Sequence, residues 1–131
     1  GSATSVELEG SEGLWSPRWS PDGKYIAALG SPNRLWLYDL ASKTKRRLTE
    51  IGAGFPSWSR DGQSLYFEDG STSTWYRVSV GGGKVEPLVN LRDLRMPGFT
   101  IGWVGLDAND SLLSTRDTST QDIYALDWDR P

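Results

Sequence analysis

The side chains that most often carry catalysis and metal binding are missing from this chain. Its 131 residues include no histidine and no cysteine. A Ser-His-Asp or Cys-His arrangement therefore cannot be assembled from it, and disulfides and thiolate metal sites are excluded as well. Seventeen acidic residues remain, and two carboxylates at a suitable separation could still hydrolyse a glycosidic bond. No spacing singles out such a pair, so we predict no enzyme, no cofactor and no metal centre.

The most regular carboxylates lie in a repeated motif. Trp19-Ser20-Pro21-Asp22-Gly23 recurs as Trp58-Ser59-Arg60-Asp61-Gly62. An aspartate that precedes a glycine in a tight turn accepts hydrogen bonds from nearby backbone amides. We therefore interpret Asp22 and Asp61 as turn caps and not as acid–base groups.

A looser third copy of the motif opens at Trp103. The loop after it is expected to be two residues longer than its counterparts, and it contains Asp107, Asn109 and Asp110. These side chains offer oxygen atoms for a weak calcium site, but their spacing does not match the EF-hand loop. Backbone capping is the favoured interpretation here too.

Two other stretches superficially resemble ligand sites. The basic run from Lys43 to Arg47 is expected on an outermost strand, where alternate residues point to water and protect the sheet edge. The run Gly81-Gly82-Gly83-Lys84 lacks the earlier glycine and the following Ser/Thr of a phosphate-binding loop. We interpret it as a hairpin turn.

The spacing of the motif predicts the elements that must position these residues. Trp19 and Trp58 lie about 40 residues apart, which is the length of one four-stranded propeller blade. Alternation of apolar and polar residues predicts strands between the turns. The expected strands are 14–19, 24–29, 34–40 and 45–49 in the first unit, 55–58, 64–68, 74–80 and 84–89 in the second, and 111–113 and 122–128 in the third.

We therefore expect an all-β protein made of three four-stranded antiparallel blades. Residues 13–50 would form the first blade, 51–91 the second, and 92–131 a third blade that lacks its own outer strand. Residues 1–12 would combine a cloning remnant, Gly1-Ser2, with a short alternating segment, Ser5–Glu9, that resembles the outer strands of the other blades. The chain is expected to be a piece of a longer protein.

Three blades cannot close a ring, since propellers have four to eight. Two chains would supply six, so we predict a two-fold homodimer that closes a six-bladed propeller. Ser5–Glu9 of each chain would complete the third blade of its partner and so hide the sheet edge. A lone arc would instead expose two apolar blade faces.

The tryptophans are expected to divide into two groups. Trp19, Trp58 and Trp103 recur at equivalent positions, which predicts that they pack between blades. Trp15 and Trp75 break the repeat and are expected to face solvent or a partner.

The repeated segments resemble a known family. Trp-Ser-Pro-Asp-Gly-Lys-Tyr-Ile at 19–26 and Trp-Ser-Arg-Asp-Gly-Gln-Ser-Leu-Tyr-Phe at 58–67 resemble the repeat of TolB-type β-propellers, which are relatives of the WD-repeat family. The ending from Asp122 to Pro131 is similar to the C-termini of bacterial winged-helix transcriptional regulators and kinases that carry such propellers. The resemblance implies six blades and protein partners. The sequence leaves the compartment open, and the resemblance favours the periplasm.

A rigid propeller displays loops at the mouth of its channel. We expect a non-enzymatic protein-interaction or sensing module whose loops bind another protein or a small ligand. Two alternatives stay open: the propeller lid or exosite domain of a hydrolase whose catalytic part is absent, and a self-assembling half-propeller without a ligand.

A net charge of −3 gives no electrostatic case for nucleic acid, and no apolar run is long enough to span a membrane. The candidate partner-binding residues are Trp15, Arg18, Phe55, Arg92, Arg95 and Phe99.

Overall fold

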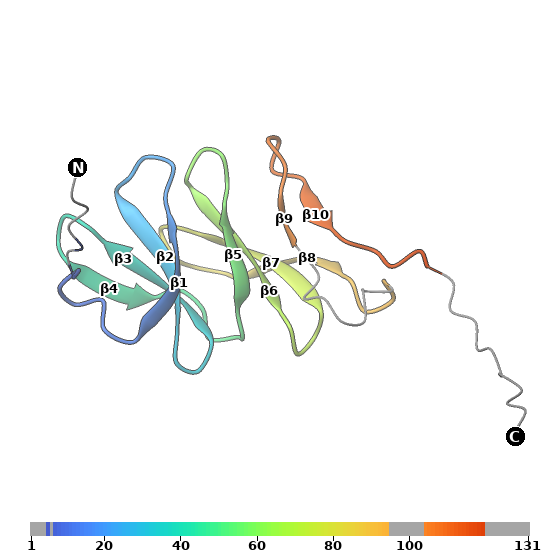
Figure 1. The fold of residues 1–131 in the computed structure, drawn as a ribbon, viewed down its shortest axis with the longest axis horizontal. Helices are drawn as coiled ribbons and strands as arrows, with labels where there is room; N and C mark the ends of the chain where they lie inside the picture. The colour runs from blue at the N-terminus through green and yellow to red at the C-terminus, as the bar shows by residue number, and fades with distance from the viewer. Residues whose placement is uncertain (1–4, 6, 95–103, 120–131) are drawn as a thin grey trace, which may run out of the picture.

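The computed structural model describes residues 5, 7–94 and 104–119, and over these residues it consists of ten β-strands without a helix (Figure 1). The strands form three antiparallel sheets that follow one another in chain order along the long axis of the molecule. The all-β class is therefore confirmed. The third sheet has two described strands and not the expected four, and the predicted strand at 122–128 lies outside the described residues.

Each of the first two sheets is a four-stranded meander, since a short turn joins each strand to the next. The predicted strand positions in both sheets are confirmed to within two residues. The first sheet contains β1 (Leu14–Trp19), β2 (Tyr25–Gly30), β3 (Arg34–Asp39) and β4 (Thr44–Arg47); the second contains β5 (Gly54–Trp58), β6 (Ser64–Asp69), β7 (Thr74–Ser79) and β8 (Glu86–Asn90); the third contains β9 (Val104–Leu106) and β10 (Leu112–Ser114).

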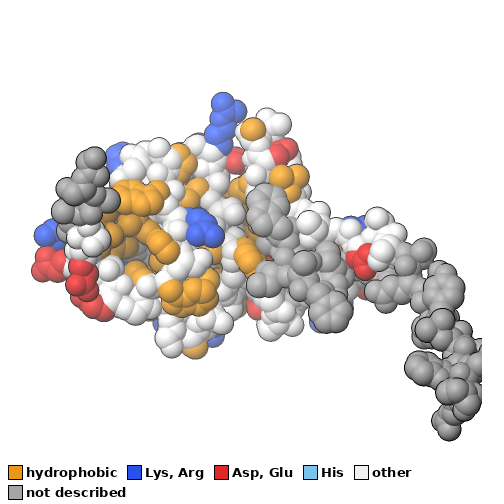
Figure 2. All heavy atoms as spheres, in the orientation of Figure 1, with side chains coloured by type: hydrophobic (Ala, Val, Ile, Leu, Met, Phe, Trp, Pro, Cys, Tyr) orange, Lys and Arg blue, Asp and Glu red, His pale blue; other side chains and the backbone are white. Residues whose placement is uncertain are grey.

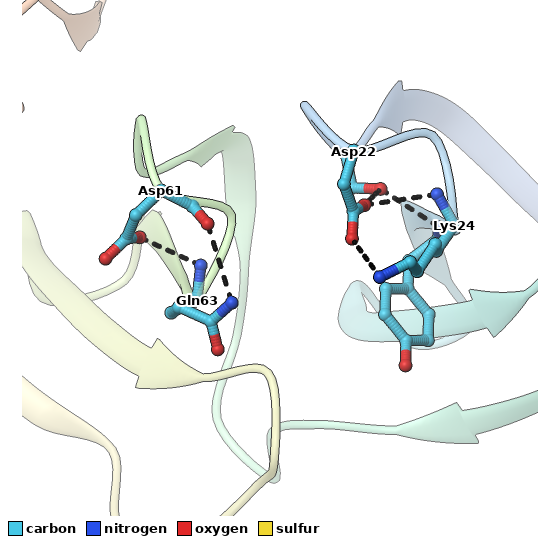
Figure 3. Close-up of polar contacts among 6 residues, drawn as sticks. Asp22, Lys24, Asp61 and Gln63 are labelled. Atoms are coloured by element: carbon cyan, nitrogen blue, oxygen red, sulfur yellow. Dashed lines mark hydrogen bonds and ion pairs between the residues drawn. The ribbon is translucent and has the colours of Figure 1, made fainter.

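The repeated aspartates cap the turns between the first two strands of each sheet (Figure 3). The Asp22 carboxylate accepts hydrogen bonds from the Ser20 hydroxyl at 2.7 Å and from the Lys24 amide at 3.1 Å. Asp61 accepts the two equivalent bonds in the second sheet, at 2.7 and 2.9 Å. In each turn the serine hydroxyl is the main cause that holds the pKa of the aspartate below its ordinary value, followed by the backbone amide. The predicted capping role is confirmed.

The third unit is aligned differently from the expectation. Leu106 pairs with Leu112 across the ladder, as Trp19 pairs with Ile26 in the first sheet. Leu106 and not Trp103 is therefore the counterpart of the repeated tryptophans. Five residues separate Leu106 from Leu112, against six between Trp19 and Ile26, so the third turn is one residue shorter and not two longer. Asp107 caps this turn, because its carboxylate accepts the Asn109 and Ser111 amides, each at 2.8 Å.

The core lies between the sheets, because neighbouring side chains along each strand point to opposite faces. Ala27, Leu29 and Leu35 of the first sheet pack against Leu65 and Phe67 of the second. On the other face of the second sheet, a smaller cluster reaches the third sheet. It consists of Tyr66 and Trp75 with the partly buried Leu91, Leu106 and Leu112.

The expected division of the tryptophans is wrong for Trp19 and Trp75. Trp75 is 1% exposed, because it lies on the inner strand β7 and faces the second cluster. Trp19 is 60% exposed, because it ends the edge strand β1, which has a neighbouring strand on one side only. Trp58 is half-buried and Trp15 is exposed, the latter as expected, while Trp103 lies outside the described residues.

The N-terminal segment lies against the first sheet. Residues 5 and 7–13 form no strand. The Glu9 carbonyl accepts a hydrogen bond from the Tyr38 hydroxyl at 2.6 Å, and the Glu9 carboxylate forms an ion pair with Lys43 at 3.1 Å. Lys45 donates to the Glu12 carbonyl at 2.6 Å. In the single chain this segment therefore covers β3 and β4 and does not extend the third sheet; its exchange between two chains stays a prediction.

The basic run from Lys43 to Arg47 is confirmed at the outer edge of the first sheet. Its partners are Glu9, Glu12 and Glu50, which form ion pairs with Lys43, Lys45 and Arg47 respectively.

Over the part of the chain described, no helical segment has the length and apolar character of a membrane crossing.

Candidate partner-binding surface

The first strand of each sheet forms a continuous surface. Strands β1, β5 and β9 are edge strands of their sheets, and β5 contacts both β1 and β9. Together they line an open depression of about 510 Å³. We call this surface the inner wall; it consists of Arg18, Trp19, Phe55, Pro56, Ser57, Trp58, Gly105 and Leu106.

A bulge before a proline shapes the inner wall at two equivalent places. The ladder shifts register between Trp15 and Arg18 in β1, and between Gly54 and Ser57 in β5. The bulged residues are Ser16 and Phe55, whose φ angles are 53° and 50°. Bulges re-aim side chains and are common beside functional sites.

Phe55 is the more strained of the two bulged residues, since a bulky side chain at positive φ is a clear outlier. This conformation costs on the order of 1–2 kcal/mol. The side chain is also 40% exposed, so burial of its ring does not account for the strain. Strain of this kind persists at sites where a side chain must be held in one place for binding. Phe55 therefore combines a strained backbone with an exposed ring on the inner wall.

A hydrogen bond fixes the Trp58 side chain of the inner wall, and Arg18 retains free donor capacity. The Trp58 indole Nε1 donates to the Arg18 carbonyl at 2.9 Å, which ties the second sheet to the first. Arg18 Nη1 donates to the Pro17 carbonyl at 2.9 Å. The Arg18 side chain is exposed and, within the described part of the chain, forms no ion pair. A guanidinium carries five N–H donors, so Arg18 can bind a carboxylate of a partner.

The structure brings together two of the six predicted contact residues, Arg18 and Phe55. Trp15 is exposed on β1 but does not line the inner wall, and Arg92 is exposed just beyond β8, where its amide donates to Asn90. Arg95 and Phe99 lie outside the described residues.

The sequence interpretation missed the exposure of Trp19, which it assigned to the core, whereas Trp58 packs against the core as predicted and also lines the inner wall. Both tryptophans end the first strand of their sheets. That position could have identified them as surface residues, because the first strand of each sheet has a neighbouring strand on one side only.

A second depression, of about 550 Å³, lies on the other side of Phe55 and is lined in part by Arg34, Glu68 and Asp69. Glu68 is half-buried because it lies opposite Trp75 in the ladder. Burial raises the pKa of its carboxyl above the ordinary value, and the neighbouring charge of Asp69 adds to the shift.

We expect Glu68→Gln to stabilise the protein at neutral pH and not in acid. A carboxyl whose pKa is raised by folding lowers the free energy of unfolding once it is ionised. This destabilisation is absent below the pKa in the unfolded chain, about 4.3, and is complete above the pKa in the folded chain. The melting temperature of Glu68→Gln should exceed that of the parent at pH 7, and the difference should vanish near pH 3.5. Glu7→Gln, at an exposed position, controls for the change in net charge. An equal gain at both pH values would contradict the assignment.

The geometry defines an all-β protein of stacked antiparallel sheets whose first strands share one surface. No family model matches the sequence. Over 72 residues, which cover 50% of this chain, the sequence is 33% identical to the Tol-Pal system protein TolB of Alcanivorax borkumensis. The matched stretch covers 16% of that protein. The fold and this similarity are consistent with a segment of a TolB-like β-propeller.

Proposed function

We propose that the chain is an arc of a TolB-like β-propeller and that its inner wall binds a protein partner without carrying out catalysis. The observation that carries the proposal is the combination, on one surface, of an exposed Trp19, a strained and exposed Phe55, and an exposed Arg18 that forms no ion pair with any described residue. Aromatic residues and arginine dominate the energetics of protein interfaces. The similarity to TolB, whose name places it in the Tol-Pal system, supports an interaction role.

The inner wall favours recognition through side chains. Pro17 and Pro56 lie in the bulges of β1 and β5 and have no N–H group. A partner strand therefore cannot form a regular ladder along either edge. Trp19, Phe55 and Trp58 offer rings for apolar or proline-containing segments, as in the aromatic grooves that bind extended peptides. We infer an extended partner segment with apolar anchors and a carboxylate for Arg18.

The proposal excludes a catalytic role for the recurrent carboxylates because they serve the turns. Asp22 and Asp61 each accept a serine hydroxyl and a backbone amide, and they lie in the turns and not on the inner wall. Within the described residues, no group of three or more acidic residues could hold a metal ion.

The proposal is tested with a library of random linear peptides displayed on phage and selected on the purified chain. Selected peptides are synthesised, and their binding is measured by fluorescence anisotropy. We expect Trp19→Ala to weaken binding about tenfold or more, as is usual for an interface hot spot. Leu88→Ala is the matched control, since Leu88 is an exposed apolar residue on β8. A library that yields no binder, or binders equally affected by both variants, would overturn the proposal.

A further inference from the structure

The first sheet has two apolar faces, and the second sheet covers one of them. Ala27, Leu29 and Leu35 face the second sheet and form the main core. Ile26 and Ala28 alternate with these residues along β2 and so point to the opposite face. That opposite face, which consists of Ile26, Ala28, Trp36 and Tyr38, is called the open face below.

The positions of the open face form a sheet–sheet interface elsewhere in the molecule. Counted along the ladders from the two repeated tryptophans, Ile26 corresponds to Leu65, and Ala28 corresponds to Phe67. Leu65 and Phe67 are the residues through which the second sheet packs on the first. The cross-strand partners agree as well: Tyr38 corresponds to Val78, and Trp36 corresponds to Tyr76. The residues of the open face therefore occupy the same positions in the first sheet as the residues through which the second sheet packs on the sheet before it.

The N-terminal segment covers most of this face, so that Ile26, Ala28 and Tyr38 are only 5%, 1% and 2% exposed in the single chain. The cover is not tightly packed. An apolar cavity of about 150 Å³ remains between Leu8 and Leu14 on one side and Ile26 and Tyr38 on the other. The buried Nε1 of Trp36 has no hydrogen-bond partner among the described residues. Protein interiors normally contain few such voids, and buried donors are normally paired. Figure 2 shows hydrophobic side chains gathered over the first sheet beside the N-terminal residues.

The third sheet presents the complementary surface. Leu112 packs back on the second sheet, so the next residue, Leu113, points away from it. By the same register, Leu113 corresponds to Ala27 in the first sheet and Tyr66 in the second. Ala27 packs against the second sheet and Tyr66 against the third, so each packs on the next sheet along the chain. Leu113 is 41% exposed because no described sheet follows.

We propose that the open face is the docking site for the third sheet of a second copy of this chain, and that docking displaces residues 5–13. The contact forms twice in a two-fold dimer, since each copy carries one open face and one Leu113. This inference rests on the proposed propeller arc, because it places the two chains as the two halves of one ring. The occupant is a second copy because the chain itself carries both complementary surfaces at its two ends.

The full chain is tested by sedimentation equilibrium from low to high micromolar concentration, with folding verified by circular dichroism. We expect a limiting mass of twice the 14.5 kDa chain mass. Leu113→Lys should weaken the dimer roughly tenfold or more, because a lysine would be buried without a partner. Leu88→Lys, at an equally exposed leucine, should leave the dimer unchanged.

Three results would overturn the inference. A folded chain that stays at the mass of one copy would show that the N-terminal segment, or blades of a longer protein, cover the open face. A dimer insensitive to Leu113→Lys would place the contact elsewhere, and a mass that grows beyond two copies would exclude reciprocal closure. The peptide experiment separates this inference from the inner wall: a monomer that binds the selected peptides overturns the dimer alone, whereas a dimer without peptide binding overturns the inner wall alone.

Discussion

Trp75→Ala is expected to lower the free energy of unfolding by about 3–5 kcal/mol, which is the usual cost of removing a buried large aromatic side chain. Trp75 is almost fully buried between the second and third sheets, where it contacts the cluster that contains Tyr66 and Leu106. Small domains are stable by only about 5–15 kcal/mol. The variant should therefore unfold at a much lower urea concentration, and the third sheet should lose its attachment to the second.

The measurement is urea denaturation followed by far-ultraviolet circular dichroism, because seven tryptophans make fluorescence hard to assign. Trp19→Ala is the matched control, since it removes the same side chain from an exposed position. Its free energy of unfolding should stay within about 1 kcal/mol of the parent. Equal losses in the two variants would contradict the burial of Trp75 and the exposure of Trp19.

Phe55→Gly and Phe55→Ala should both abolish binding of the selected peptides while differing from each other in stability. Both variants remove the ring from the inner wall, so each should weaken binding at least tenfold. Only glycine removes the steric cost of the positive φ at this position. Phe55→Gly should therefore be more stable than Phe55→Ala by about 1 kcal/mol.

Ser16→Gly provides the control for this pair, because Ser16 lies at the equivalent bulge but not on the inner wall. It should relieve strain and leave peptide binding unchanged. The measurements are urea denaturation for stability and fluorescence anisotropy for affinity. If Phe55→Gly kept the affinity of the parent, the Phe55 ring would have no role in recognition.

The strands and their turns could be predicted from the sequence because they depend on local chemistry. A continuous apolar run marks β2, and a run rich in β-branched and aromatic residues marks β7. The Asp-Gly pairs at 22–23 and 61–62 mark the turns that the aspartates cap. These features need no knowledge of neighbouring sheets. The first two units were therefore placed to within two residues at the strand ends.

The inner wall could be predicted only in part, because burial depends on which strand has a neighbour. Recurrence showed that Trp19 and Trp58 are equivalent, but equivalence does not fix burial: Trp58 packs against the core, whereas Trp19 is exposed. The bulge at Phe55 left no sequence mark beyond the following proline. In the third unit a leucine replaces the repeated tryptophan, so only the hydrogen-bonded register identifies Leu106 as its counterpart.

The matching positions on successive sheets also bear on how such a chain can evolve. A gene segment encoding one sheet and its following turn could be duplicated in tandem, and the new sheet would meet compatible neighbours on both sides. The inserted unit would then pack on Ile26 in place of the N-terminal segment, as the first sheet packs on Leu65 now. Lengthening by duplication would need no simultaneous redesign of the older units.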